Sequence, residues 1–200
     1  MNLDKYGVGQ DPYCYPGTTV LCNHLNLRDD DLLSQAERDL SSIAASEIDF
    51  VLPPYDLPYL QNIHRRLFLD LYPWAGELRT VDISKGDTHF CTVNRIEPEA
   101  QKMFRCLAQA NWLEGLSRPG LVSACAEHFG DLNMLHPFRE GNGRAQRIMF
   151  EHLILNAGYT VSWWAVNERE WVEANIAAVV CNYQPMTAVF EQCIGQPIVE

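Results

Sequence analysis

The sequence has little positive charge and no long hydrophobic run. Lys and Arg together number 15 against 26 Asp and Glu, which gives a formal net charge of -11. Such a chain repels polyanions at long range, which argues against direct binding of DNA or RNA. No apolar run approaches the roughly 20 residues that span a bilayer, and residues 1–9 do not resemble a signal peptide. We therefore expect a cytoplasmic protein without membrane contact.

Cysteine pairs are also missing. The seven cysteines are scattered without a C-x-x-C motif, so neither a disulfide framework nor a zinc finger is encoded, and buried free thiols are expected. Glycine and proline are ordinary in number, and the hydrophobic fraction of 47% excludes collagen-like and disordered classes. A chain of 200 residues is sufficient for one core. We expect an irregular N-terminal arm over 1–27, packed on a domain over 28–200.

Apolar residues at spacings of three and four predict a largely helical chain. Residues 79–94 are different, because apolar residues alternate there around Lys85-Gly86-Asp87, which predicts one β-hairpin. The helices are expected from Arg28 to Pro53, from Asp56 to Tyr72, after Pro98, after Pro119, from Gly143 to Gly158, over 167–181 and over 185–194.

One segment between two of these helices, HPFREGNGRAQR at 136–147, carries residues suited to chemistry. Two glycines flank Asn142 and allow a sharp turn, and the following helix directs free N–H groups toward an anion. Arg144 and Arg147 are three residues apart, so they share one helix face. Guanidinium groups match phosphate oxygens in pairs. The segment therefore predicts a site for the phosphates of a nucleotide.

Two other residues of the segment extend this prediction. Glu140 is a hard carboxylate, and Mg²⁺ takes one or two protein carboxylates together with substrate phosphates. His136 is suited to act as a base. Each feature alone is more often structural, since a Gly-rich loop is usually a turn and a histidine at a helix end is usually a cap. The segment also lacks the Walker pattern and the preceding strand of a dinucleotide-binding motif, so the prediction depends on the combination.

The segment at 136–147 resembles the signature of Fic domains, H-P-F-x-[D/E]-G-N-G-R-x-x-R, and every fixed position matches. Residues 71–79, LYPWAGELR, resemble the part of that family that leads to a β-hairpin flap, and residues 81–90 resemble the flap. The arm around Asp11-Pro12-Tyr13 and the tail after Gly158 are similar as well. The resemblance implies an all-α Fic fold, a helical bundle with one β-hairpin flap, and points to the Fic toxins of bacterial toxin–antitoxin modules.

The resemblance also implies an activity and a role for each matching residue. The protein would transfer AMP from ATP, with Mg²⁺, to a hydroxyl side chain of a target protein. The implied targets are the B subunits of type II topoisomerases, DNA gyrase and topoisomerase IV. His136 would be the general base, Glu140 would hold the metal, and Phe138 would pack the loop into the core. The residues expected to contact ATP are Gly141, Asn142, Gly143, Arg144, Arg147, Lys85, Gly86 and Gln184.

The flap predicts a second kind of contact, because an exposed hairpin edge can pair with an extended segment of another protein. The expected docking residues are Ile83, Lys85, Gly86, Asp87, Thr88 and Phe90. Tyr183 and Gln184 are candidates for facing the adenine.

Control of the enzyme is predicted from a motif that is missing. Fic proteins that restrain themselves carry [S/T]-x-x-x-E-[G/N], whose Glu pairs with the residue that corresponds to Arg147. Here E-[G/N] occurs only at Glu114 and Glu140, and the residues four positions earlier are Ala110 and His136. Neither fits. The resemblance therefore implies that a small antitoxin supplies the glutamate in trans and contacts Arg147.

Two alternatives remain open. One is a Fic enzyme of different transfer chemistry, which phosphorylates or moves phosphocholine. Members that phosphorylate carry Lys in place of the second loop glycine, so Gly143 argues against that branch. The other is a catalytically silent Fic module that docks proteins through its flap, which the intact His136, Glu140 and Arg147 argue against. The sequence leaves open the identity of the target and the oligomeric state.

Overall fold

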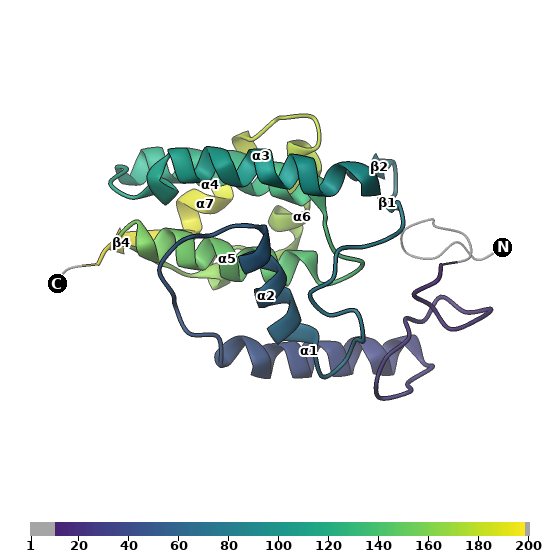
Figure 1. The fold of residues 1–200 in the computed structure, drawn as a ribbon. Coiled ribbons are helices and arrows are strands. Elements are labelled where there is room, and N and C mark those ends of the chain that lie inside the picture. The colour runs from purple at the N-terminus through teal and green to yellow at the C-terminus, as the bar shows by residue number, and fades with distance from the viewer. Residues whose placement is uncertain (1–10, 199–200) are drawn as a thin grey trace.

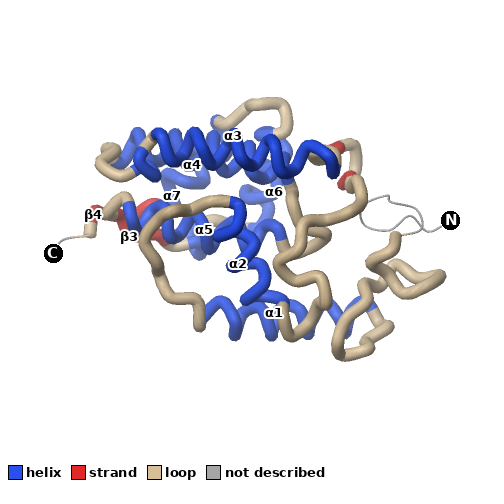
Figure 2. Tube along the Cα trace, viewed as in Figure 1, coloured by secondary structure: helices blue, strands red, loops and turns tan. Residues whose placement is uncertain are grey.

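The computed structural model describes residues 11–198 and is mainly helical, with two small two-stranded sheets in that range (Figures 1 and 2). The helices are α1 (Asp30–Ser46), α2 (Leu57–Phe68), α3 (Ile96–Gln109), α4 (Arg118–Leu135), α5 (Asn142–Asn156), α6 (Glu168–Ala178) and α7 (Gln184–Cys193). The strands are β1 (Ser84–Lys85), β2 (Thr88–His89), β3 (Tyr159–Val161) and β4 (Ile194–Pro197). The predicted fold class is confirmed.

The helices pack in a row that leads from α1 to α3. α1 packs on α2, α2 on α5, α5 on α4 and α4 on α3, while α6 and α7 pack against each other and against α4 (Figure 1). The β1–β2 hairpin lies at one end of this row, near the C-terminal end of α4. The loop between α4 and α5 therefore lies at the same end of the molecule as the hairpin.

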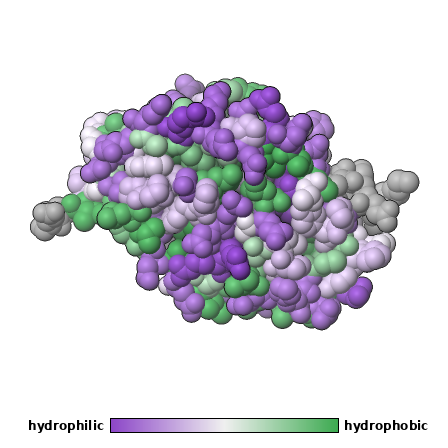
Figure 3. All heavy atoms as spheres, in the orientation of Figure 1, coloured by the Kyte–Doolittle hydropathy of each residue, from purple (hydrophilic) through white to green (hydrophobic). Residues whose placement is uncertain are grey.

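On the face shown in Figure 3, hydrophobic residues form separate small areas among hydrophilic ones.

Helix ends follow the capping residues that the sequence supplies. The Asp29 side chain accepts a hydrogen bond from Leu32 N at the start of α1, and the Asp56 side chain accepts one from Tyr59 N at the start of α2. α3 begins at Ile96, before the start expected after Pro98. That expectation was wrong because proline is tolerated in the first helical turn, where its missing N–H has no intrahelical partner.

The β3–β4 sheet was not predicted, because its strands are short and directly follow α5 and α7. β3 and β4 are antiparallel, with Tyr159 opposite Pro197. A Cβ on Gly195 would lie 2.3 Å from Thr160 Oγ1, so a larger residue there would require the Thr160 hydroxyl to turn away. The sequence therefore predicted one hairpin, and the described residues contain a second two-stranded sheet.

The described part of the N-terminal arm, residues 11–27, is irregular apart from an isolated bridge between Cys14 and Leu21. Both of these residues are buried in the core, so the arm is packed on the helices. The remainder of the predicted arm lies outside the described residues, and the division of the chain at residue 27 stays a prediction. Among the described residues, no helix is both long and apolar enough to cross a lipid bilayer.

All seven cysteines lie within the described residues and are free. The prediction of buried thiols is right for three of them and wrong for two that are exposed, Cys106 and Cys181. Both exposed cysteines are near the ends of helices, where a short apolar run gives no indication of which side faces solvent.

Candidate active site

His136 ends α4 and begins the loop that leads to α5. Its backbone is left-handed, with φ 45°, and its N–H donates to Leu132 O over 3.2 Å. Its Nδ1 lies 3.1 Å from Asn133 O, an acceptor, so Nδ1 carries the proton and Nε2 is the acceptor nitrogen of the ring. The loop therefore presents a histidine in a defined tautomer.

The surroundings of His136 keep the imidazole neutral. Burial lowers its pKa to about 4, and the positive charges of Arg79 and Lys85 act in the same direction. The Asn133 carbonyl and the charge of Glu140 oppose this shift. The Phe90 ring stacks on the imidazole with 3.9 Å between ring centroids. At neutral pH the ring is therefore uncharged and able to take a proton.

The loop keeps its shape through Asn142 and Gly141. The Asn142 side chain accepts from Phe138 N over 2.9 Å and donates to Phe138 O over 2.8 Å, which closes the loop on itself. Gly141 has φ 78°, and a Cβ there would lie 2.3 Å from the Phe68 ring. Only glycine fits that position. Gly143 is different, because a Cβ there would meet no atom within 4 Å.

Helix α2 supports the loop through His64. The His64 Nδ1 accepts from Gly76 N, so its Nε2–H donates to Glu140 O over 2.9 Å. The His64 ring stacks on the fully buried Phe138 with 3.9 Å between ring centroids. Phe138 is thus part of the core, as the resemblance implied.

The N-terminal arm supports the loop from another side. Arg139 donates through Nε to Asp11 Oδ2 over 2.7 Å and through Nη2 to the same oxygen. Both side chains are almost fully buried, with exposed fractions of 3% and 1%. A buried ion pair of this kind fixes geometry, because either charge alone would be costly in the interior.

Helix α1 contacts the first of the two arginines on α5. The Arg144 guanidinium pairs with the Glu37 carboxylate and donates to Ser41 Oγ over 2.9 Å, and it lies over the Phe68 ring. The Tyr72 hydroxyl donates to the other Glu37 oxygen. The expected phosphate ligand Arg144 is therefore already held by a carboxylate of this chain.

Arg147, the second arginine, has a different environment. Its guanidinium lies over the Trp171 ring at 5.6 Å, and no carboxylate within residues 11–198 pairs with it. Burial and the neighbouring charge of Arg144 lower its pKa. It lines a cleft of about 610 Å³ between α1 and α5, and Glu140 and Arg144 line the same cleft. The predicted metal ligand and both predicted phosphate ligands thus lie around one hollow.

The flap is the β1–β2 hairpin, in which Ser84 pairs with His89 and Lys85 with Thr88. The tip residues Gly86 and Asp87 are exposed, and Gly86 has φ 57°. Ile83 is buried, so any contact that it makes with a target would be through its backbone.

Gln184, another predicted ATP ligand, lies apart from these residues. It is exposed at the start of α7 and does not line the cleft. The adjacent Tyr183 donates to Asp131 on α4 over 2.6 Å. The structure therefore does not bring Gln184 together with the predicted phosphate ligands.

Four residues around the site were not predicted as site residues: Asp11, Glu37, His64 and Arg79. Each supports the loop from a distant part of the sequence, and no local pattern identifies such contacts. The one available signal was the presence of Asp11 and Arg79 in segments that resemble Fic proteins.

Comparison with known proteins decides the family. The family model of the Fic/DOC family matches residues 54–154. The chain belongs to the Fic/DOC family. It is 38% identical over 193 residues to the probable protein adenylyltransferase Fic of Escherichia coli strain K12, and the alignment covers 96% of each chain. The chain is accordingly a protein adenylyltransferase, and the all-α Fic fold expected from the signature is its fold.

Solved Fic structures agree with this assignment. BepC of Bartonella tribocorum with bound AMPPNP superimposes with a TM-score of 0.86 at 28% identity, and the match covers 100% of both chains. The Fic domain of a cell filamentation protein from Bartonella quintana with bound ADP gives 0.85 at 28% identity, covering 93% of this chain and 95% of that one. Both relatives hold an adenine nucleotide.

Proposed function

We propose that this adenylyltransferase transfers AMP from ATP to a hydroxyl side chain of a target protein, with His136 as the general base. The observation that carries the proposal is the position of a neutral imidazole at the start of a loop whose other residues suit phosphates. The hydroxyl oxygen of the target attacks the α-phosphorus, its proton moves to His136 Nε2, and pyrophosphate leaves.

The basicity of His136 is consistent with this role once nucleotide is bound. Its pKa of about 4 in the free protein is low for a base. Phosphate charges beside the ring would favour the imidazolium and raise the pKa toward neutrality. The base would therefore become effective where the substrate is present.

The loop and the start of α5 supply an environment for the phosphates. The N-terminus of α5 offers backbone N–H groups to an anion. No contact within the described protein explains glycine at position 143, and the open space there leaves room for phosphate oxygens. Arg147 would neutralise the charge that remains. Because the Fic enzymes that phosphorylate carry Lys at this position, Gly143 makes that chemistry the less favoured alternative.

Glu140 fits a magnesium ion. It lines the cleft that Arg147 also lines, and Mg²⁺ needs only one or two carboxylates besides phosphate oxygens and water. When bound there, the ion would neutralise phosphate charge. Glu140 would hold it on the nucleotide side of His136.

A toxin that is silenced in trans is the role we propose in the cell. Arg147 lies in a cleft without a carboxylate partner among the described residues, so a glutamate on a small antitoxin could occupy the guanidinium and exclude the γ-phosphate. Adenine binding by Gln184, docking of the target on the flap, topoisomerase B subunits as targets and a cytoplasmic location belong to the same proposal. They rest on the resemblance to Fic toxins.

One experiment tests the chemistry. The chain is incubated with a cell lysate and ATP labelled at the α- or the γ-phosphate, and modified proteins are identified by mass spectrometry. Label from the α-position alone is expected. His136→Ala should lose transfer by about 10²–10⁴-fold, whereas His128→Ala, which changes another histidine of α4, should not. Transfer by His136→Ala at the parent rate would show that His136 is not the general base. Label from the γ-phosphate on the target would indicate a kinase.

A second experiment tests the antitoxin. A small protein with the [S/T]-x-x-x-E-[G/N] motif should co-purify and inhibit transfer, and replacement of its Glu by Gly should restore transfer. If a neighbour without such a glutamate silences the chain equally well, the Arg147 mechanism is wrong.

A further inference from the structure

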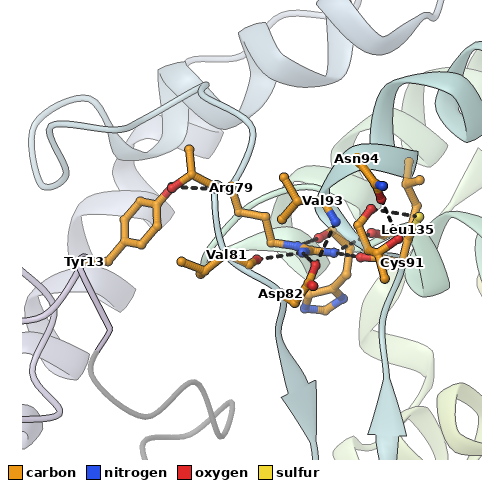
Figure 4. A network of polar contacts seen from close by, with 11 residues as sticks. Tyr13, Arg79, Val81, Asp82, Cys91, Val93, Asn94 and Leu135 are labelled. Carbon is orange, nitrogen blue, oxygen red and sulfur yellow. Dashed lines mark hydrogen bonds and ion pairs between the residues drawn. The ribbon is translucent and has the colours of Figure 1, made fainter.

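A single buried arginine joins the flap to the end of α4. Arg79 donates through Nε to His136 O over 2.8 Å, through Nη1 to Val81 O over 2.7 Å, and through Nη2 to Cys91 O and, over 3.5 Å, to Leu135 O (Figure 4). Its side chain has no exposed surface. One guanidinium therefore serves four backbone carbonyls from two parts of the chain.

These carbonyls belong to the positions that matter for the site. Val81 begins the flap and Cys91 directly follows it, and Leu135 and His136 end α4. A helix C-terminus carries partial negative charge, which explains why a buried cation is stable there. The nearest carboxylate, Asp82, is 3.8 Å away and largely exposed. Carbonyls are thus the main partners of Arg79.

Two backbone hydrogen bonds join the same two parts of the chain as the guanidinium does. Arg79 N donates to Pro137 O over 2.9 Å, and Cys91 N donates to Met134 O over 3.0 Å. Farther along the flap, the Phe90 ring stacks on the His136 imidazole at an interplanar angle of 18°. Residues next to both ends of the flap therefore contact the backbone around His136, and Phe90 of the flap contacts its ring.

We propose that Arg79 is a positioning residue for transfer: it holds both ends of the flap and the His136 carbonyl as one unit, so that a target bound on the flap is placed correctly for the imidazole. This inference rests on the proposed roles of His136 and of the flap. It predicts that loss of the guanidinium harms transfer to protein and leaves nucleotide binding intact.

Lysine is the informative replacement for Arg79. Arg79→Lys keeps the charge, but an ammonium is compact and cannot span carbonyls on opposite sides as a planar fork does. Arg118 provides a matched control, because it also donates to backbone carbonyls, that of Glu191 in α7 and those of Ile194 and Gly195 in β4. Arg118→Lys removes a similar fork from a place without a link to the flap.

The experiment measures kcat and KM for transfer to a purified protein that was found labelled in the lysate, and Kd for AMPPNP. Arg79→Lys should lower kcat by about 10- to 100-fold, with Kd for AMPPNP unchanged within about twofold. Arg118→Lys should keep the parent kcat. Phe90→Leu should also lower kcat, and its effect should not add to that of Arg79→Lys, since both act on one unit.

Several results would overturn the inference. These are a parent kcat in folded Arg79→Lys, additive effects of the two substitutions, or an equal loss in Arg118→Lys. If Arg79→Lys does not fold, Phe90→Leu decides alone, and a parent kcat for it refutes the coupling. The His136→Ala variant separates this outcome from a failure of the proposed function, because the base is tested there without reference to Arg79.

Discussion

The loop at 136–147 and the flap at 81–90 lie side by side but are built differently. The loop is held by the N-terminal arm through Asp11, by α1 through Glu37 and by α2 through His64. The flap has two strands of two residues each and an exposed tip. The loop is therefore held by contacts from three elements, whereas the tip of the flap is exposed.

This difference agrees with the role proposed for each region. ATP has the same phosphates in every turnover, and donors that are fixed beforehand need no reorganisation during the reaction. A segment of a target protein varies in sequence, and backbone pairing along a hairpin edge tolerates such variation. We therefore expect substitutions in the loop supports to cost stability, and substitutions at the flap tip to change target binding.

The largest effect should come from breaking the arm–loop contact. Asp11→Asn removes the carboxylate charge that pairs with the buried Arg139 and should lower the free energy of unfolding by about 3–5 kcal/mol. Urea unfolding of the parent and the variant measures the difference in free energy. Glu173→Gln, in the exposed Arg169–Glu173 pair, is the control and should change stability by less than about 0.5 kcal/mol. Similar effects of the two variants would contradict the buried pair.

The second largest effect should come from acid, which weakens the support that His64 on α2 gives to the loop. Burial lowers the pKa of His64 to about 4 from its ordinary 6.5. Because the unfolded chain binds this proton more readily, stability is full above pH 6.5 and falls as the pH drops toward 4, by an amount on the order of 3 kcal/mol. Unfolding of the parent and of His64→Gln at several pH values measures the contribution. An equally steep fall in the variant would assign the effect to other groups.

A smaller cost is expected inside the loop. Asn142→Ala leaves the N–H and the C=O of buried Phe138 without their side-chain partner, and should cost about 1–3 kcal/mol. It should also weaken AMPPNP binding, because the loop at 136–147 loses its shape. Asn175→Ala, which removes an amide that donates only to Trp171 O, is the control. An Asn142→Ala variant as stable as this control would show that the loop keeps its shape without the amide.

The smallest effect on stability is expected at the flap tip. Lys85→Ala changes an exposed side chain and should shift the free energy of unfolding by less than about 0.5 kcal/mol. KM for the target protein should rise while Kd for AMPPNP changes little, which kinetics and calorimetry can separate. A rise confined to the nucleotide Kd would place Lys85 with the loop.

The elements that could be predicted from the sequence are those with local causes. Helices α1 and α2 follow from apolar spacing and from Asp29 and Asp56 as caps, and the loop follows from a contiguous motif. The pairing of Arg144 with Glu37 could not be predicted, because it joins residues 107 positions apart. Arg144 and Arg147 have the same sequence signal and different partners, so tertiary contacts alone distinguish them.

The contact between Asp11 and Arg139 also has a consequence for biosynthesis. The two residues are 128 positions apart, and contacts of such long range form late because closing a long chain segment costs entropy. On the ribosome, the arm emerges first and has no partner until α4 and the loop have followed. The loop at 136–147 therefore gains its contact with the arm only after Arg139 has been made, and a nascent chain that stops within α4 lacks that contact.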